Sequence, residues 1–405
     1  PGDRFWDEHA GIVLTSGPMT PPASPALRLH PSTARAYRCT CGAQVFFRNN
    51  TCLQCGRALG FDPWLGQVLA IEPDADPGVW RAVTQPSSEN GDAPQQRYRR
   101  CAQIDTPALC NWLVRDNGAA EGAAAVFSCV ACRLNRVIPD LGLDQNHEPW
   151  RKVELARRRL VSQLIGLGLP VEPPSQDGGP GGLVFDTLAS LPGQAPVLTG
   201  HAQGVITLNL AEADDAYREQ VRSQMREPYR TLLGHYRHEV GHHFWDRLIR
   251  DDPCLQGFRE LFGDERQDYV GALNAHYQQG APTGWASAYI SSYASAHPWE
   301  DWAETWAHYL HMRDTLDTAV SFGMAPDEVD VDALHYLPSV LQEEPAPEVD
   351  VFLAMLNAWT RLTAVLNELS RSMGLPDFYP FVLSDTVVRK LYFVHGRVEP
   401  FERTT

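Results

Sequence analysis

The alternation of hydrophobic and polar positions predicts two strands in the middle of the chain. Residues 204–210, GVITLNL, place large aliphatic side chains at every second position from Ile206 to Leu210, which is typical of a half-buried strand. We expect this strand to lie at the edge of a sheet. The sequence LVFDTL at 183–188 follows a glycine-rich stretch and predicts a second strand. These two short strands indicate a small sheet.

Helical periodicity covers most of the rest of the second half. In 151–169 apolar residues recur at three- and four-residue intervals until Pro170 ends the pattern, and this apolar run is too short to span a bilayer. The segment 226–250 also has a helical apolar face. Further helices are expected from near Pro298 and over about 349–373. The chain is therefore predicted to be α+β, with a mostly helical C-terminal part.

The first third of the chain has a different character. Residues 1–36 are rich in proline, serine and small residues without a sustained period, so we expect an extended N-terminal arm. From Cys39 to Gly60 a short aromatic strand separates two cysteine pairs, each of which is followed by glycine. Residues 83–97 are polar and turn-rich and predict a loop.

Composition and charge narrow the class of protein. Of 405 residues, 43% are hydrophobic and 21% are charged, which is typical of a globular protein and excludes collagen and wholesale disorder. Lysine and arginine number 34 against 50 acidic residues, so the net charge is -16. This charge would repel a nucleic acid unless a local basic patch overrode it, and only Arg157, Arg158 and Arg159 form such a run. We therefore expect neither a nucleic-acid partner nor, since no run of 18 apolar residues occurs, a membrane partner.

The nine cysteines divide into two groups of four and one single residue. The groups are Cys39, Cys41, Cys52 and Cys55, and then Cys101, Cys110, Cys129 and Cys132. Thiolates in close pairs around a strand suit tetrahedral zinc, so the first group predicts a structural zinc site. The second group, with wider spacing, predicts another zinc site, unless Cys101 and Cys110 are buried core thiols. We expect Cys254 to fill apolar space.

The use of cysteine also bears on the compartment. A long chain whose cysteines concentrate in its first third, with no recognisable signal peptide, does not read as a secreted disulfide scaffold. A reducing, cytoplasmic compartment with thiolates held for metal is the expectation. Because closed four-thiolate sites leave no room for water, they favour a docking module. Its expected ligand is a protein partner, since the chain is acidic and lacks aromatic residues interleaved with lysines.

The clearest chemical motif is HEVGH at 238–242. On a helix, His238 and His242 lie on one face and can bind one zinc ion, while Glu239 can reach a water that the zinc activates and take its proton. The alternative is a surface helix that happens to contain several histidines. The neighbouring His235 and His243 are expected to be ordinary helix residues.

A catalytic zinc site needs a third protein ligand, and the best source is the segment 289–311. On a helix from Pro298, the side chains of Glu300, Glu304 and His308 form one polar stripe beside large apolar residues. Buried carboxylates in that setting are costly without a cation. The alternative is a solvated acidic face at the start of a helix, where the helix dipole favours negative charge.

The pairing of HEVGH with SYASAHPWEDWAETW resembles the gluzincin clan of zinc metallopeptidases, whose second helix carries E-x-x-A-E. By position, the resemblance implies that Glu300 is the third zinc ligand and that Glu304 holds a ligand histidine. It also implies that Tyr293, seven residues before Glu300, donates a hydrogen bond to the oxyanion of the tetrahedral intermediate. A competing third ligand is Glu265, which has Asp264 and Asp268 nearby; otherwise this acidic cluster would support the site or cap a helix.

A wider set of motifs, including CGAQVFFRNNTCLQCG, CVACRLNRVIPDL and HPWEDWAETWAHYLHM, resembles a bacterial family of zinc-binding metallopeptidases with an N-terminal zinc ribbon. The resemblance covers nearly the whole chain from about residue 37. It implies an arm over 1–36, a zinc-ribbon region with two four-cysteine sites over 37–135 and a zincin-like metallopeptidase domain over 136–405. One catalytic zinc and one or two structural zinc ions are expected.

Three functions are compatible with these motifs. The first is hydrolysis of peptide bonds in a peptide or protein substrate by zinc-activated water. The second is a non-enzymatic, zinc-stabilised protein-binding adaptor that retains HExxH only to hold its fold, and the third is hydrolysis of a non-peptide amide. Intact Glu239 and Tyr293 favour an enzyme, because a purely structural site needs neither residue.

Overall fold

The fold is seen in a computed structural model, which describes residues 34–83, 96–116, 127–174, 181–190, 193, 197–225, 227, 229–341 and 346–402. Residues 1–33 of the expected arm, and 84–95 of the expected loop, lie outside the described residues. Of the arm's last three residues, Arg35 is buried and its Nε lies 3.0 Å from a carboxylate oxygen of Asp314.

The N-terminal region is built from antiparallel strands. A hairpin of β1 (Tyr37–Arg38) and β2 (Gln44–Val45) carries Cys39 and Cys41, and Cys52 and Cys55 follow it, so β2 is the short strand expected between the cysteine pairs. A five-stranded sheet follows in the order β3 (Ala58–Asp62), β4 (Gln67–Pro73), β5 (Trp80–Ala82), β6 (Arg97–Arg100) and β7 (Leu113–Arg115). Its first and last strands approach closely, because Gly60 has no Cβ to collide with Leu113.

A second, four-stranded sheet has the order β10 (Gly200–Ala202), β11 (Val205–Asn209), β9 (Val184–Leu188) and β8 (Asn135–Val137). The predicted strands at 183–188 and 204–210 are confirmed as β9 and β11. The expectation that 204–210 forms the sheet edge is wrong, because β10 pairs antiparallel along its outer side. Gln203 and Gly204 make that hairpin possible by adopting φ values of 50° and 81°.

Eight α-helices account for most of the remaining described chain. They are α1 (His147–Gly166), α2 (Asp215–Met225), α3 (Leu232–Leu248), α4 (Leu255–Phe262), α5 (Tyr269–Gln279), α6 (Pro298–Ser321), α7 (Pro347–Ser372) and α8 (Asp385–Glu402). Short 3-10 helices are η2 (Ala102–Asp105), η3 (Cys132–Leu134), η4 (Asp144–Asn146), η5 (Leu210–Ala213), η6 (Trp285–Ser287), η7 (Tyr293–Ala296), η8 (Pro326–Glu328) and η9 (Pro338–Leu341). The predicted helices are confirmed, and so is the α+β architecture.

The pair α3 and α6 forms the centre of the helical part. Gly241 of α3 lets the backbone of α6 come close, since a Cβ at this position would lie 3.0 Å from the Cα of Ala303. The indole of Trp302 then donates a hydrogen bond of 2.8 Å to the carbonyl of Gly241. The rings of Phe244 and Trp306 stack with their centroids 5.0 Å apart. This contact fixes the start of α6 against the middle of α3.

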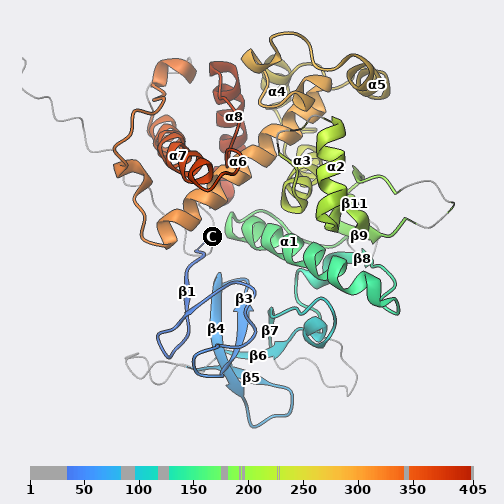
Figure 1. The fold of residues 1–405 in the computed structure, drawn as a ribbon, viewed down its shortest axis with the longest axis vertical. Coiled ribbons are helices and arrows are strands. Elements are labelled where there is room, and N and C mark those ends of the chain that lie inside the picture. Colours follow the sequence, from blue (N-terminus) through green and yellow to red (C-terminus); the bar gives the residue numbers. More distant parts are fainter. Residues whose placement is uncertain are drawn as a thin grey trace, which may run out of the picture.

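Helix α1 lies between the five-stranded sheet and the layer of C-terminal helices (Figure 1). The run at 157–159, the one candidate for a basic patch, is not such a patch, because Arg157 and Arg158 point into the protein. Arg157 pairs with Glu154 at 2.7 Å and donates to the carbonyl of Ala131, and Arg158 donates to the carbonyl of Ala108 at 2.9 Å. Both are almost fully buried, and the partly exposed Arg159 pairs with Asp314 at 2.8 Å, so the run at 157–159 does not present three free cations to a nucleic acid.

Two further features concern domains and membranes. The strand β8 spans the predicted boundary between residues 135 and 136 and pairs with β9, and the boundary itself stays a prediction.

Among the described residues, α7 alone is long and apolar enough to cross a membrane by length and composition. Because 56% of its most apolar window is buried inside the protein, and core helices pass the same test, this is weak support for a membrane span.

Candidate metal centre

The sequence brings two histidines and a glutamate together where α3 meets α6. Thr231 caps α3 by accepting a hydrogen bond from the amide of Gly234, and His238 and His242 then project from the same face one turn apart. Glu300 lies in the first turn of α6. Its Oε2 is 3.0 Å from Nε2 of His238 and 3.6 Å from Nε2 of His242.

This geometry fits a metal ion. For tetrahedral zinc with bonds of about 2.0–2.2 Å to nitrogen and oxygen, neighbouring ligand atoms lie about 3.3–3.5 Å apart. Glu300 is only 1% exposed, and its Oε2 accepts no hydrogen bond from the described residues although both imidazoles face it. Burial alone would raise the pKa of Glu300, but the neighbouring histidines hold it well below its usual value. A buried, charged oxygen with two nitrogen atoms beside it is a suitable set of ligands for a cation.

Glu304 and Ser291 orient the first histidine. Oε1 of Glu304 lies 2.8 Å from Nδ1 of His238, so Nδ1 carries the proton and Nε2 is left to face the metal position. The hydroxyl of Ser291 donates to Oε2 of Glu304 at 2.6 Å. Burial opposes ionisation of Glu304, yet the bonds to His238 and Ser291 lower its pKa to about 2. Glu304 is therefore an anion that fixes the ring of His238.

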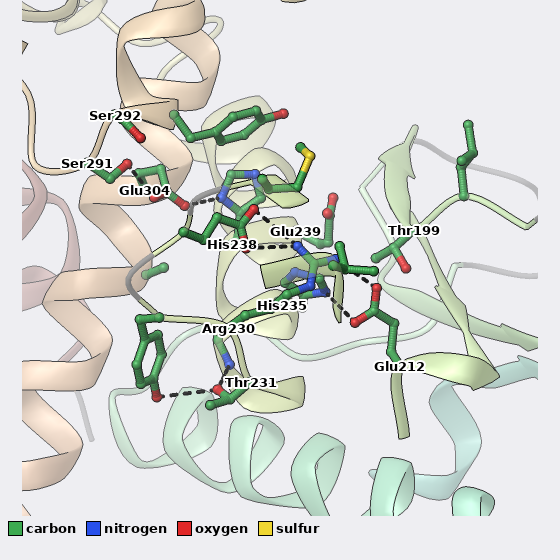
Figure 2. A pocket seen from close by; sticks show the side chains of 18 of the residues that line it. Thr199, Glu212, Arg230, Thr231, His235, His238, Glu239, Ser291, Ser292 and Glu304 are labelled. Carbon is green, nitrogen blue, oxygen red and sulfur yellow. Dashed lines mark hydrogen bonds and ion pairs between the residues drawn. The ribbon is translucent and has the colours of Figure 1, made fainter. Parts of the chain in front are cut away.

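Glu239 and Tyr293 line the same cavity as His238, which has a volume of about 550 Å³. Figure 2 shows His238 and Glu239 on α3, with Glu304 approaching from α6 on one side and Glu212 from the strand side on the other. Burial, together with the charges of Glu300 and Glu304, raises the pKa of Glu239. The ring of Tyr293 lies 5.9 Å from the ring of His238 between centroids, and burial raises its pKa well above the usual value. Tyr293 therefore keeps its proton and can act as a donor.

The competing acidic cluster has other partners. Glu265 forms an ion pair with Arg259, whose Nε is 2.9 Å from Oε2 of the glutamate. Asp264 accepts bonds from Arg266, and Asp268 caps α5 by accepting from the amide of Gly271. None of the three joins the group that His238, His242 and Glu300 form within the described chain. Asp268 thus has the capping role that was the alternative for this cluster.

The histidines outside the HExxH motif also lie outside that metal-ready group. His235 faces Glu212 at 3.6 Å, and His243 is buried beside His201 of β10. Burial lowers the pKa of His235 to about 3 and that of His243 to about 4, so both are neutral near pH 7. His308 continues the polar stripe of α6 and lies 2.6 Å from the hydroxyl of Tyr379.

Two residues of the centre were not predicted. The hydroxyl of Tyr269 donates a hydrogen bond of 2.6 Å to Oε1 of Glu300, so it fixes the carboxylate whose other oxygen faces the histidines. The ring of His201 stacks on His242 with centroids 6.1 Å apart. Neither residue has a recognisable spacing to the motif, because each comes from a separate element that only the fold brings close.

Both cysteine groups have the geometry of tetrahedral zinc ligands. Sulfur atoms lie 3.7 Å apart for Cys39 and Cys55, for Cys41 and Cys52, and for Cys110 and Cys129. Zinc–sulfur bonds of about 2.3 Å give a tetrahedral edge of about 3.8 Å, whereas a disulfide requires about 2.05 Å. In each group all four sulfur atoms lie within 4.8 Å of one another. The alternative that Cys101 and Cys110 stand apart from the last pair does not fit this arrangement.

The two groups differ in their surroundings. In the first, Cys41 and Cys55 are exposed, whereas all four cysteines of the second are buried. Cys254 is half-buried and its thiol points to the carbonyl of Leu248 at 3.6 Å, in keeping with a filler of partly apolar space.

Comparison with known proteins gives the family context. A family described as "Putative zinc-binding metallo-peptidase" matches residues 146–397, and a family described as "zinc-ribbon domain" matches residues 36–143. Curated relatives from Mycobacterium bovis and Mycobacterium tuberculosis, each described as an uncharacterized protein, are 40% identical over 367 residues. The match covers 90% of this chain and 95% of each relative. No solved structure matches the chain.

Proposed function

The chain belongs to the family described as "Putative zinc-binding metallo-peptidase", with a zinc ribbon before it, and from this premise we propose that it hydrolyses peptide bonds. His238, His242 and Glu300 are the proposed zinc ligands. The observation that carries the proposal is that the three ligand atoms lie within 4.8 Å of one another, while one of these ligands, His238, lines a cavity together with Glu239 and Tyr293. A site that served only to hold the fold would need neither Glu239 nor Tyr293.

The residues divide the chemistry among them. Zinc bound at the three ligands would lower the pKa of a water molecule and polarise the carbonyl of the cleaved bond. Glu239, whose pKa burial raises toward neutrality, accepts the proton of the attacking water and passes it to the leaving amine. Tyr293 donates its proton in a hydrogen bond to the carbonyl oxygen as negative charge develops there. Glu304 keeps His238 in the tautomer that ligation requires.

The two cysteine groups are the proposed structural zinc sites. Four thiolates complete a tetrahedron and leave no position for water, so these sites stabilise the fold and carry no hydrolytic step. All nine cysteines, each of which is described, are free of disulfides, which supports the proposal that the protein works in a reducing, cytoplasmic compartment. The protein partner expected for the ribbon stays a prediction.

The test combines metal analysis with one substitution and a digest of β-casein, an unstructured substrate. The wild type is expected to hold about three zinc ions and to cleave casein. Glu239→Gln should keep all its zinc, because it is not a ligand, and lose about 10²–10⁴-fold in rate. Metal content is measured by inductively coupled plasma mass spectrometry and cleavage by mass spectrometry of the products.

A second variant separates the roles at the same site. Tyr293→Phe removes the phenol proton but keeps the ring, so we expect a loss of about a hundredfold in kcat with zinc content unchanged. A Glu239→Gln protein as active as wild type would rule out the mechanism. A zinc-loaded wild type that cleaves no peptide, while binding a protein partner, would support the adaptor function instead.

A further inference from the structure

Two helices, α2 and α5, contribute apolar side chains to the lining of the cavity beside the metal centre. On α2, Tyr217, Val221 and Met225 face it, and on α5, Tyr269, Leu273 and Tyr277 face it. In both helices the three residues are spaced by four, so each helix presents a single apolar stripe to the cavity. Both stripes belong to the lining of one cavity.

Neither helix uses its stripe to build the core. Described residues of α2 and α5 include no buried side chain, although each helix carries the apolar stripe described above. Helices at the surface of a globular protein normally bury their apolar face against the interior. Here the apolar faces remain partly exposed, with Met225 at 40% and Tyr277 at 54%. Apolar surface kept open to a cavity is a feature of ligand-binding sites.

The stripe on α5 is continuous with the reacting groups. Its first residue, Tyr269, donates a hydrogen bond to Glu300, and its last, Tyr277, stacks on Tyr293 with ring centroids 6.5 Å apart. Leu273 lies between them on the same face of the helix. A side chain held against Leu273 would therefore belong to a residue next to the bond that is cleaved.

The charged residues of the cavity also favour an uncharged side chain of a substrate. Arg230 bridges two carboxylates, at 2.8 Å from Glu212 and 3.0 Å from Glu227. Among the described residues that line the cavity, Arg230 is the only arginine or lysine, and the carboxylates outnumber it. An acidic side chain held against the two stripes would find no unpaired arginine or lysine among these lining residues.

We propose that α2 and α5 form the walls of a subsite that selects a large apolar or aromatic side chain beside the cleaved bond. This inference rests on the peptidase function proposed above and names the class of substrate: polypeptide segments rich in leucine or phenylalanine, presented in extended form. Burial of such a side chain against the two stripes stabilises the transition state, and an aspartate at that position forgoes this gain.

The first measurement is specificity. Internally quenched peptides are made in which each of the two central residues is varied through Leu, Phe, Ala and Asp. At one of the two positions kcat/KM should be at least about tenfold higher for Leu and Phe than for Ala, and lowest for Asp. A preference for Asp or Lys, or no preference at either position, would overturn the proposal.

The second measurement assigns the selectivity to the two helices. Val221→Ala on α2 and Leu273→Ala on α5 should each lower kcat/KM for the Phe peptide about five- to tenfold and leave the Ala peptide nearly unchanged. The matched controls are Gln220→Ala on α2 and Val270→Ala on α5, which lie off the cavity lining; Val270 is 66% exposed. Equal effects of test and control variants would show that the stripes have no role. Circular dichroism and Tm confirm that each variant is folded.

Binding separates this proposal from the peptidase function. In the Glu239→Gln protein, fluorescence anisotropy of labelled Phe and Asp peptides reports binding without cleavage. If the Phe peptide binds more tightly, and Leu273→Ala in that background removes the difference, the subsite stands even when the wild type proves unable to cleave. If peptides are cleaved without any preference, the subsite is wrong and the peptidase function stands.

Discussion

Two clusters of charged side chains join α3 to α6. They begin at adjacent residues of α3, but their side chains are arranged differently. Arg237 and His238 are consecutive on α3. Arg237 donates to Asp314 of α6 at 2.8 Å, while His238 meets Glu300 and Glu304 of the same helix. The first cluster is closed by further arginines, whereas the second directs nitrogen and oxygen atoms toward one common point.

The difference lies in the partners of the carboxylates. Asp314 receives Arg35, Arg159 and Arg237 within 3.0 Å, and an arginine has no lone pair to offer a metal. Burial alone would raise the pKa of Asp314, but the three guanidinium groups lower it far below its usual value. Glu300 faces imidazole nitrogen atoms, which can ligate once they are unprotonated. The base that each buried acidic residue faces thus decides whether a metal ion could bind beside it.

The largest effect is expected when the proposed third zinc ligand, Glu300, is removed. Glu300→Ala should lose one zinc ion of about three and reduce hydrolysis below detection, because two histidines alone hold zinc weakly. Glu265→Ala is the control. Because Glu265 pairs with Arg259, the Glu265→Ala protein should retain all its zinc. Metal content per chain decides the matter; loss of zinc in the Glu265 variant instead would reassign the ligand.

The second prediction concerns the arginine cluster. Asp314→Asn leaves three guanidinium groups without their shared anion, so we expect a loss of about 3–5 kcal/mol in the free energy of unfolding, measured in urea. Because the pKa of Asp314 is lowered in the folded protein, its contribution is complete above its unfolded pKa of about 4. It declines only as the pH falls through that value toward the folded pKa. The loss in the free energy of unfolding should accordingly be the same at pH 6 and pH 8. The zinc content of the variant should not change.

The smallest effect is expected on zinc affinity, when Glu304 beside the metal centre is changed. Glu304→Gln keeps the shape of the side chain but removes the negative charge that holds Nδ1–H of His238. We expect zinc affinity at this centre to fall about 10- to 100-fold, as found for partners that orient metal ligands. Competition with a zinc-sensitive dye measures the change. An unaltered affinity would reduce Glu304 to a residue that only completes the polar stripe of α6.

Much of this centre was predictable because its signals are local. The spacing of His238 and His242 on one helix, and the stripe that begins at Glu300, are properties of consecutive residues under helical periodicity. The resemblance to known peptidases supplied the roles of Glu300, Glu304 and Tyr293, and the structure places all three residues around His238. Their catalytic roles stay predictions until the variants are measured.

Other features were out of reach because they depend on contacts between distant segments. Tyr269 reaches Glu300 only after α5 has been placed, and β10 covers the edge of β11 through a three-residue strand too short to show a pattern. The five-stranded sheet of the N-terminal region was also missed, since three of its strands, β5, β6 and β7, have only three or four residues. The arginine run was misread for the same reason: sequence shows charge but not the carbonyls and carboxylates that surround it.

The buried arginines of α1 determine where the protein can be divided. Arg157 and Arg158 donate across the junction between the two matched families, to the carbonyls of Ala131 and Ala108. A fragment cut between residues 143 and 146 would keep these two cations and lose the two carbonyl oxygens that accept hydrogen bonds from them. Although two families describe the chain, we therefore expect the peptidase region expressed alone to be less stable than a protein that keeps both regions.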